Sequence, residues 1–206
     1  MDEQRSLSHL VLTIPSLKLP LFTTVFQSGI EITTPAGSSL GQFLNALPGF
    51  TTDYLAKTVQ TIFLNGSPVD DLTIQLNGER PTVALSAAMP GLAGAIFRRY
   101  SFHAALRSDT KKSQSLSPQA SKPLTVTLKL FNTIALDRGR DLFLAGVRLP
   151  AAVLSSFLHK RPELTQEILR IQLNDRDIDS TTLHQQLTLP AQIDLKIFAE
   201  KATTNG

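Results

Sequence analysis

The stretch TIFLNGSPVDD at residues 61–71 has a second version, RIQLNDRDIDS, at residues 170–180. Each version is an apolar run, then Asn, then a short polar segment that returns to an apolar residue followed by Asp. Asn, Gly and Asp tolerate positive φ and bond their own backbone, so each version predicts a strand that ends in a tight turn. The recurrence, 109 positions apart, indicates that one fold occurs twice in the chain.

Three further matched blocks keep the same order in both halves. LGQFLNALP at 40–48 corresponds to LSSFLHKRP at 154–162, TVALS at 82–86 to QIDLK at 192–196, and Gly29 to Gly139. Small drifts in spacing are what loop-length changes between two copies would produce. The sequence therefore predicts a tandem duplication, whose copies are joined by the Ser-, Lys- and Pro-containing linker at 107–123.

Within the second copy, residues 125–131 alternate apolar and polar side chains, the period of a half-buried strand. A turn through 137–139 leads into DLFLAG at 141–146, which predicts a hairpin, and residues 150–159 have helical spacing. The first copy agrees: HLVLTI, then FQSGIEIT, then a helix with a capping box from Ser39 to Gln42.

With the repeated turn and a last strand, each copy has the order ββαββ. The predicted fold is therefore α+β, with two tandem domains, each a mixed sheet of about four strands and one main helix. The expected boundaries are a first domain at 8–95, a basic connecting segment and linker at 96–123, and a second domain at 124–200.

Composition narrows the functional classes. The 206 residues are 42% hydrophobic and 18% charged, which fits a globular protein, and they include no cysteine. Disulfides, thiolate catalysis and cysteine-ligated zinc are thereby excluded. The polar, acidic start MDEQRSLSHL does not look like a secretory signal, so we expect a cytoplasmic protein. The uncharged run at 81–97 is too short, and carries too much proline, to predict a membrane span.

Motifs for catalysis are missing from the sequence. The four histidines have no HxxH or HExxH spacing, and no G-x-S-x-G, Walker A or G-x-G-x-x-G segment occurs. A calcium loop counted from Asp175 would need Gly and Glu where Ser180 and Gln186 stand. The sequence therefore predicts a protein that is not an enzyme, with no cofactor and no metal site.

The pattern resembles the ubiquitin-like β-grasp proteins, in particular the sulfur carriers of molybdopterin and thiamine synthesis. VTLKLFNTIALDRGRD at 126–141 is similar to their opening hairpin, TIFLNGSPVDD to their "hydrophobic-x-[VL]-N-G-x-x-V" segment, and TVALSAAMPGLAGA at 82–95 to their terminal strand and glycine tail. The resemblance implies a tail carboxylate that a partner adenylates and converts to a thiocarboxylate. Here Ala95 follows Gly94 and the chain continues. Gly91 and Gly94 are therefore either a tail-like processing site or a flexible strand exit.

IFRRYSFHAALR at 96–107 is the most distinctive remaining segment. Its aromatic and arginine residues suit a partner-binding surface or an oligomer contact, and single-stranded nucleic acid binding uses the same residue types. The predicted partner-binding residues are Phe97, Arg98, Arg99, Tyr100 and Phe102.

The leading hypothesis is a non-catalytic protein-interaction module. The resemblance implies as its partner an adenylating enzyme or a cofactor-synthesis complex, and leaves a homo-oligomer open. One alternative is a sulfur-carrier precursor cleaved after Gly94. Another is an RNA-binding protein that acts through residues 96–112, although no basic face appears outside the central piece.

Overall fold

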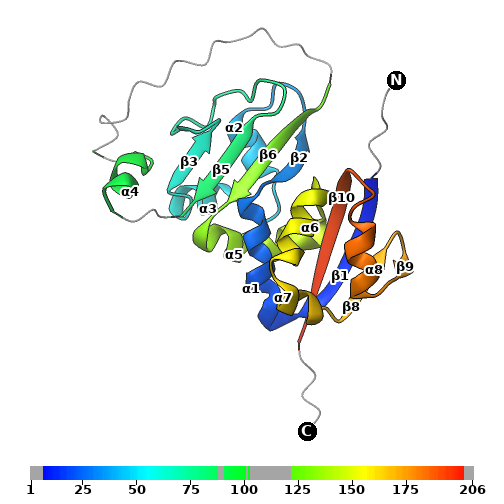
Figure 1. Ribbon diagram of the computed structural model, residues 1–206. Helices are drawn as coiled ribbons and strands as arrows, with labels where there is room; N and C mark the ends of the chain where they lie inside the picture. Colours follow the sequence, from blue (N-terminus) through cyan, green and yellow to red (C-terminus); the bar gives the residue numbers. More distant parts are fainter. Residues whose placement is uncertain (1–6, 88–90, 101, 103–121, 202–206) are drawn as a thin grey trace. The chain divides into compact units, whose positions relative to one another are not determined.

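The computed structural model describes residues 7–87, 91–100, 102 and 122–201 (Figure 1). The chain divides into two compact units. The terminal unit combines Met1–Ile30 with Gly139–Gly206, and the central unit is Glu31–Arg138. The limits of these units, at 30/31 and 138/139, do not coincide with the boundaries expected at 95/96 and 123/124. Each unit takes segments from both halves of the sequence. Residues 107–121 of the linker predicted at 107–123 lie outside the described residues.

The central unit has a sheet of five strands in the order β4-β3-β5-β6-β2. β5 and β6 run parallel, with Val83 opposite Leu128, whereas β3 is antiparallel to both β4 and β5. β6 comes from the second half of the sequence and lies between two strands of the first half. The strands are β2 (Ile30–Thr34), β3 (Thr61–Leu64), β4 (Ser67–Pro68), β5 (Thr82–Ser86) and β6 (Leu124–Leu130).

Helices complete the central unit. The predicted capping box is confirmed: Gln42 N donates to Ser39 Oγ, and Ser39 N donates to the Gln42 side chain. The helix that this box begins packs on the inner face of the sheet. The helix contributes Leu40, Phe43 and Leu44 to the core, and the strands contribute Ile62, Val83, Leu85 and Leu128. The helices are α2 (Leu40–Asn45), α3 (Thr52–Lys57), α4 (Gly91–Phe97) and the first part of α5 (Asn132–Ala145).

The terminal unit has its own five strands in the order β7-β10-β1-β8-β9. β1 and β10 pair in parallel along their whole length, from Leu7 opposite Gln192 to Pro15 opposite Glu200. β7 is antiparallel to β10, and β8 is antiparallel to β1 and β9. The strands are β1 (Leu7–Pro15), β7 (Val147–Pro150), β8 (Arg170–Leu173), β9 (Arg176–Asp177) and β10 (Gln192–Glu200).

Short helices pack on one face of this sheet, with α6, α7 and α8 in front of β1 and β10 in Figure 1. The rings of Phe26 and Phe143 stack with centroids 4.7 Å apart, and Phe22 lies 6.1 Å from Phe157. The helix predicted at 150–159 is present as α6. The helical elements are η1 (Ser16–Lys18), α1 (Leu19–Phe22), η2 (Thr23–Gln27), the rest of α5, α6 (Ala151–His159), α7 (Pro162–Gln166) and α8 (Ser180–Gln186).

The predicted α+β class is confirmed, but the predicted ββαββ order is wrong. The predicted turn at 137–139 and residues 141–145 of the predicted strand belong to α5, whose buried face carries Ile134, Ala135, Leu142 and Phe143. In the first half, residues 16–27 are helical in the same way, and the next strand begins only at Ile30. Each unit therefore has five strands and several helices, not about four strands and one helix.

The repeated stretch forms the same turn twice. Asn65 and Gly66 have φ of 51° and 80°, and Asn174 and Asp175 have φ of 47° and 64°, so both pairs adopt the left-handed conformation that a tight hairpin requires. Asn65 Oδ1 accepts from Thr82 N at 2.8 Å, and Asn65 N donates to Thr82 O at 2.8 Å. We call this two-bond arrangement the Asn clamp.

The second Asn clamp holds a strand from the other half of the sequence. Asn174 Oδ1 accepts from His9 N at 2.9 Å, and Asn174 N donates to His9 O at 2.8 Å. In the sequence match, β5 corresponds to β10. In the structure, β5 is the antiparallel partner of β3, whereas the corresponding partner of β8 is β1 and not β10. The two units thus share one local turn, but the clamped strand comes from the same half of the sequence in the central unit and from the other half in the terminal unit.

Replacing Asn174 by Ala is expected to lower the free energy of unfolding by about 1.5 kcal/mol, through a lost hydrogen bond and a less tolerated positive φ. Asn174→Gly should cost less, because Gly adopts positive φ without strain. Chemical denaturation measures both variants. Asp175→Gly is the control, since it leaves the Asn clamp intact and reproduces the Asn-Gly pair of the first turn. A loss in Asp175→Gly equal to that in Asn174→Ala would contradict a role for the clamp.

Among the described residues, no helix is both long and apolar enough to span a bilayer. The uncharged run at 81–97 divides instead between β5, three residues outside the described part, and α4.

Candidate protein interface

The chain leaves β5 and forms α4 at the point where the resemblance implied a glycine tail. Gly91 begins this helix with φ of 72°, a conformation that favours glycine. Gly94 is buried within it, and its carbonyl accepts from Arg98 N at 3.0 Å. Both glycines of the predicted tail-like site therefore lie in a helix.

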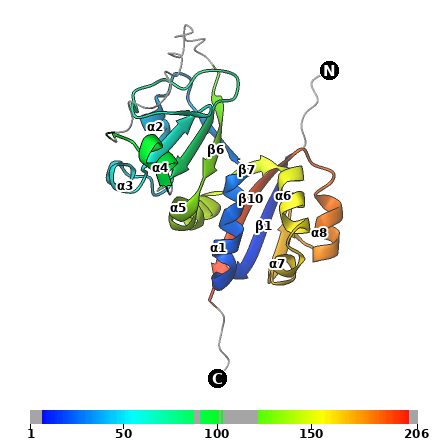
Figure 2. The same ribbon diagram turned by 60° about the vertical axis from the view of Figure 1, so that its left-hand side comes forward.

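The end of α4 docks on the central unit through one aromatic contact. Ile62 and Leu64 point into the core, so Phe63 between them faces the other side of the sheet. There the Phe63 and Phe97 ring centroids are 5.4 Å apart at an interplanar angle of 60°. Figure 2 shows α4 in front of the strands of the central unit.

Arg99 fixes the same segment by its backbone and its guanidinium. Its N–H donates to Gln60 O at 2.7 Å, and Nη1 donates to Leu55 O at 3.2 Å and to Val59 O at 3.5 Å. These carbonyls lie at and just beyond the C-terminal end of α3, where the helix dipole attracts a cation.

Tyr100 connects the segment to the repeated stretch. Its hydroxyl donates to Asp70 O at 3.1 Å, and its N–H lies 3.4 Å from Asp70 Oδ2. Asp179, the counterpart of Asp70, instead caps α8 by accepting from Thr182 N at 2.6 Å, and this hydrogen bond lowers the pKa of Asp179. Two matching residues thus hold different segments.

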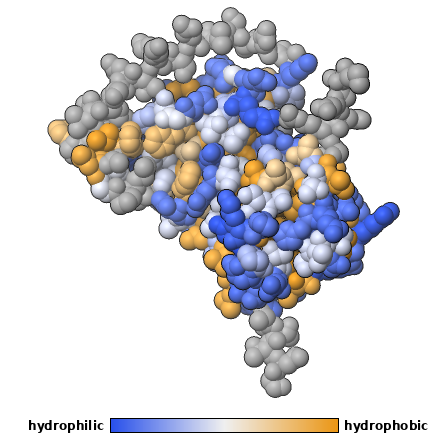
Figure 3. All heavy atoms as spheres, in the orientation of Figure 1, coloured by the Kyte–Doolittle hydropathy of each residue, from blue (hydrophilic) through white to orange (hydrophobic). Residues whose placement is uncertain are grey.

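Three large side chains of the segment are exposed. The exposed fractions are 70% for Leu92, 75% for Tyr100 and 95% for Phe102. Figure 3 shows hydrophobic side chains gathered over α4. We call Leu92, Tyr100 and Phe102 the outer face of the α4 segment.

The sequence grouped five residues as one partner-binding set, and the structure divides them. Phe97 and Arg99 are half-buried and fasten the segment to the central unit, whereas Arg98, Tyr100 and Phe102 are exposed. Leu92 belongs to the exposed group but was not among the predicted residues. Its exposure could not be predicted, because residues 81–97 contain no charged side chain that would indicate which face meets solvent.

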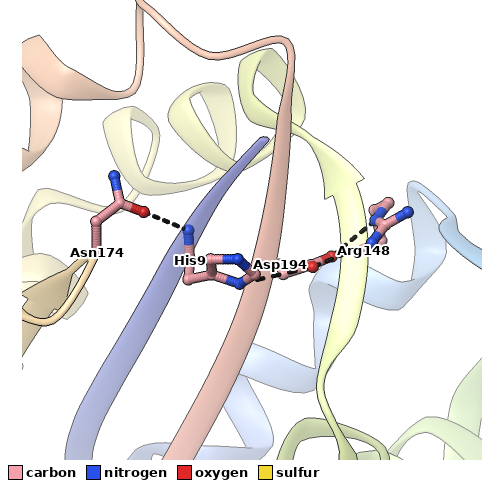
Figure 4. A network of polar contacts seen from close by, with 4 residues as sticks. All are labelled: His9, Arg148, Asn174 and Asp194. Atoms are coloured by element: carbon pink, nitrogen blue, oxygen red, sulfur yellow. Dashed lines mark hydrogen bonds and ion pairs between the residues drawn. The ribbon is translucent and has the colours of Figure 1, made fainter. Parts of the chain in front are cut away.

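A polar network crosses the sheet of the terminal unit, as Figure 4 shows. Arg148 Nε donates to Asp194 Oδ1 at 2.7 Å and Nη2 to Oδ2 at 3.1 Å, and His9 Nδ1 lies 3.7 Å from Asp194 Oδ2. Asn174 joins the row through its clamp on His9 N. The four residues tie β7, β10, β1 and the turn after β8 together, and we assign them a structural role.

Tyr54 forms a second polar cluster that the sequence did not indicate. Its hydroxyl donates to Asp137 Oδ2 at 3.2 Å, and the Arg138 guanidinium carbon lies 3.8 Å from its ring centroid. Burial raises the pKa of Tyr54 above its usual value. The folded state therefore favours the neutral phenol, a stabilisation that is present below the usual pKa and lost as the pH rises through the raised one. The cluster joins α3 to α5.

Within the described residues, no group of three or more His, Cys, Asp or Glu side chains is placed to hold a metal ion. No family model matches the chain, and no curated protein or solved structure matches it significantly.

Proposed function

We propose that this chain is a non-catalytic, cytoplasmic protein-interaction module whose partner docks on the outer face of the α4 segment. The observation that carries the proposal is an exposed set of Leu92, Tyr100 and Phe102 on a segment whose other side is fastened by Phe97 and Arg99. Aromatic anchors held rigidly lose little conformational entropy on binding, and they dominate the energy of protein interfaces.

The central unit supports a β-grasp relationship as part of this proposal. Its parallel pair β5 and β6 lies between β3 and β2, and α2 follows β2, an order that resembles ubiquitin-like sheets. By that resemblance, an adenylating enzyme or a cofactor-synthesis complex is the proposed class of partner. The partner would present an apolar groove that accepts the two exposed aromatic rings.

Replacing Leu92 and Phe102 together by Ala is expected to reduce partner capture about tenfold or more, because truncating a buried interface anchor costs about 2 kcal/mol. The measurement is a quantitative pulldown from the native host, compared with wild type. Leu189→Ala is the matched control, since Leu189 is also 70% exposed and lies in the terminal unit. Thermal denaturation should show that all variants remain as stable as wild type.

Equal capture by wild type and the Leu92/Phe102 variant would contradict the proposed surface. Purified protein that turned over a metabolite without any stoichiometric partner would contradict the whole function.

Two other functions give different results in simple measurements. Processing after Gly94 would produce a species of that mass in protein from the native host. It would also require α4 to unwind, because Gly94 is buried and its carbonyl is bonded within the helix. RNA binding would be salt-sensitive and would weaken when Arg98 and Arg99 are replaced by Ala. Full-length mass and no salt-sensitive RNA binding are the results that this proposal expects.

A further inference from the structure

The terminal unit contains a cleft between η2 and α6. Its volume is about 430 Å³, within the range of small-molecule sites. The polar lining comes from both elements: Thr24, Gln27, Ser28, Ser156, Lys160 and Arg161. Ala152, Val153 and Phe157 supply the apolar part.

The polar lining consists of hydrogen-bond donors of positive or neutral charge. Two cations, three hydroxyls and one carboxamide line the cleft, and no carboxylate is among its lining residues. In the described part of the chain, the side chains of Gln27, Ser28, Ser156 and Lys160 make no hydrogen bond or ion pair with other protein groups. Their donors are therefore available to a ligand.

Arg161 is held in place before any ligand arrives. Its guanidinium carbon lies 4.4 Å from the centroid of the Phe157 ring, and its Nη1 donates to Phe157 O at 3.3 Å. That bond uses one of five N–H donors, and it also offsets the negative end of α6 next to the cleft. A guanidinium fixed in this way loses less entropy when it binds a phosphate.

The duplicated framework does not itself require these cations. In the match of LGQFLNALP with LSSFLHKRP, Lys160 and Arg161 correspond to Ala46 and Leu47. Leu47 is 5% exposed and serves the core of the central unit, whereas its counterpart Arg161 is half-buried beside the cleft. Ala46 and Lys160 are both exposed. Because only one of the two matched stretches carries the dibasic pair, a helix of this kind does not need the pair in order to form, which favours a role for it in binding.

We infer that the cleft between η2 and α6 binds a small organic phosphate, with the phosphate on Lys160, Arg161 and Ser156 and the organic part against Val153 and Phe157. A phosphate monoester has three acceptor oxygens, one for each of the three donor side chains, whereas a carboxylate has only two oxygens. The cleft is also larger than inorganic phosphate requires, which leaves room for an organic group.

The test is an NMR titration of the full chain with phenyl phosphate, inorganic phosphate and vesicles that contain phosphatidic acid. We expect saturable shifts of the Ser28, Ser156 and Lys160 amides with phenyl phosphate, with a Kd of about 1 mM or tighter, and weaker binding of inorganic phosphate. Lys160→Ala should raise the Kd about fivefold or more, since it removes a charge-assisted hydrogen bond. Ser156→Ala should raise it less.

Lys57→Ala is the charge-matched control, because Lys57 is exposed and lies in the central unit. It should leave the Kd unchanged. Shifts that do not saturate at about 20 mM phenyl phosphate would overturn the inference. It would equally be overturned by an effect of Lys57→Ala as large as that of Lys160→Ala, or by binding to vesicles alone. None of these outcomes bears on the α4 interface, which lies in the other unit.

Discussion

Expressed as separate fragments, residues 1–110 and 111–206 are each expected to remain largely unfolded, and to recover the native state only when mixed. The first fragment has β2, β3, β4 and β5 but lacks β6, which lies between β5 and β2. The second has β7, β8, β9 and β10 but lacks β1, the partner of both β10 and β8. A sheet without a central strand loses the pairing and the apolar face that hold its neighbours.

Amide dispersion in NMR spectra and the cooperativity of urea unfolding measure whether each fragment is folded. Each fragment alone should show narrow dispersion and no sigmoidal transition, and an equimolar mixture should show the spectrum of the intact chain. Two contiguous tandem domains would give the opposite result. A well-dispersed spectrum and cooperative unfolding of residues 111–206 alone would therefore contradict the strand arrangement.

Replacing Gly139 by Ala is expected to destabilise the terminal unit by about 3 kcal/mol, the upper end of what overpacking a core costs. Gly139 lies in the middle of α5, where helix propensity alone would predict a gain of about 1 kcal/mol. The added Cβ would overlap Thr23 Cγ2 and lie 3.2 Å from Phe26 Cε2. Thr23 and Phe26 are both buried, so neither can move aside into solvent.

Thr23→Ser gives this prediction its control. It removes the overlapping methyl group and keeps the hydroxyl that donates to Pro20 O at 2.8 Å. In a double-mutant cycle followed by urea unfolding, Gly139→Ala should cost clearly less in the Thr23→Ser background. A Gly139→Ala protein that is as stable as wild type would show that α5 does not pack closely on η2.

Features that depend on neighbours along the chain could be predicted from the sequence. The Ser39 capping box needs only Gln42, and the two Asn turns need only the residues that adopt positive φ. The hairpin predicted at 137–139 is wrong, because Gly139 suggests a turn in the sequence but lies inside α5. Position 139 of this helix is a glycine because Thr23 and Phe26 approach it too closely for a Cβ, and no local pattern records that contact.

The pairing of strands could not be predicted in this way. Alternating apolar residues in β1 and β6 specify which face is buried, and the same alternation suits any neighbouring strand. The orientation of side chains at the candidate interface could not be predicted from the sequence either. Phe97 and Tyr100 are both aromatic, and only the positions of Phe63 and Asp70 decide which of them turns inward.

The parallel pairing of β1 with β10 has a consequence for synthesis on the ribosome. Leu7 pairs with Gln192, so β1 must wait until β10 has emerged before this partner exists. During that interval the apolar row of Leu10, Leu12 and Ile14 lacks the neighbouring strands β8 and β10. Newly made chains should therefore depend on chaperones that shield nascent N-terminal segments, and premature termination should leave aggregation-prone products.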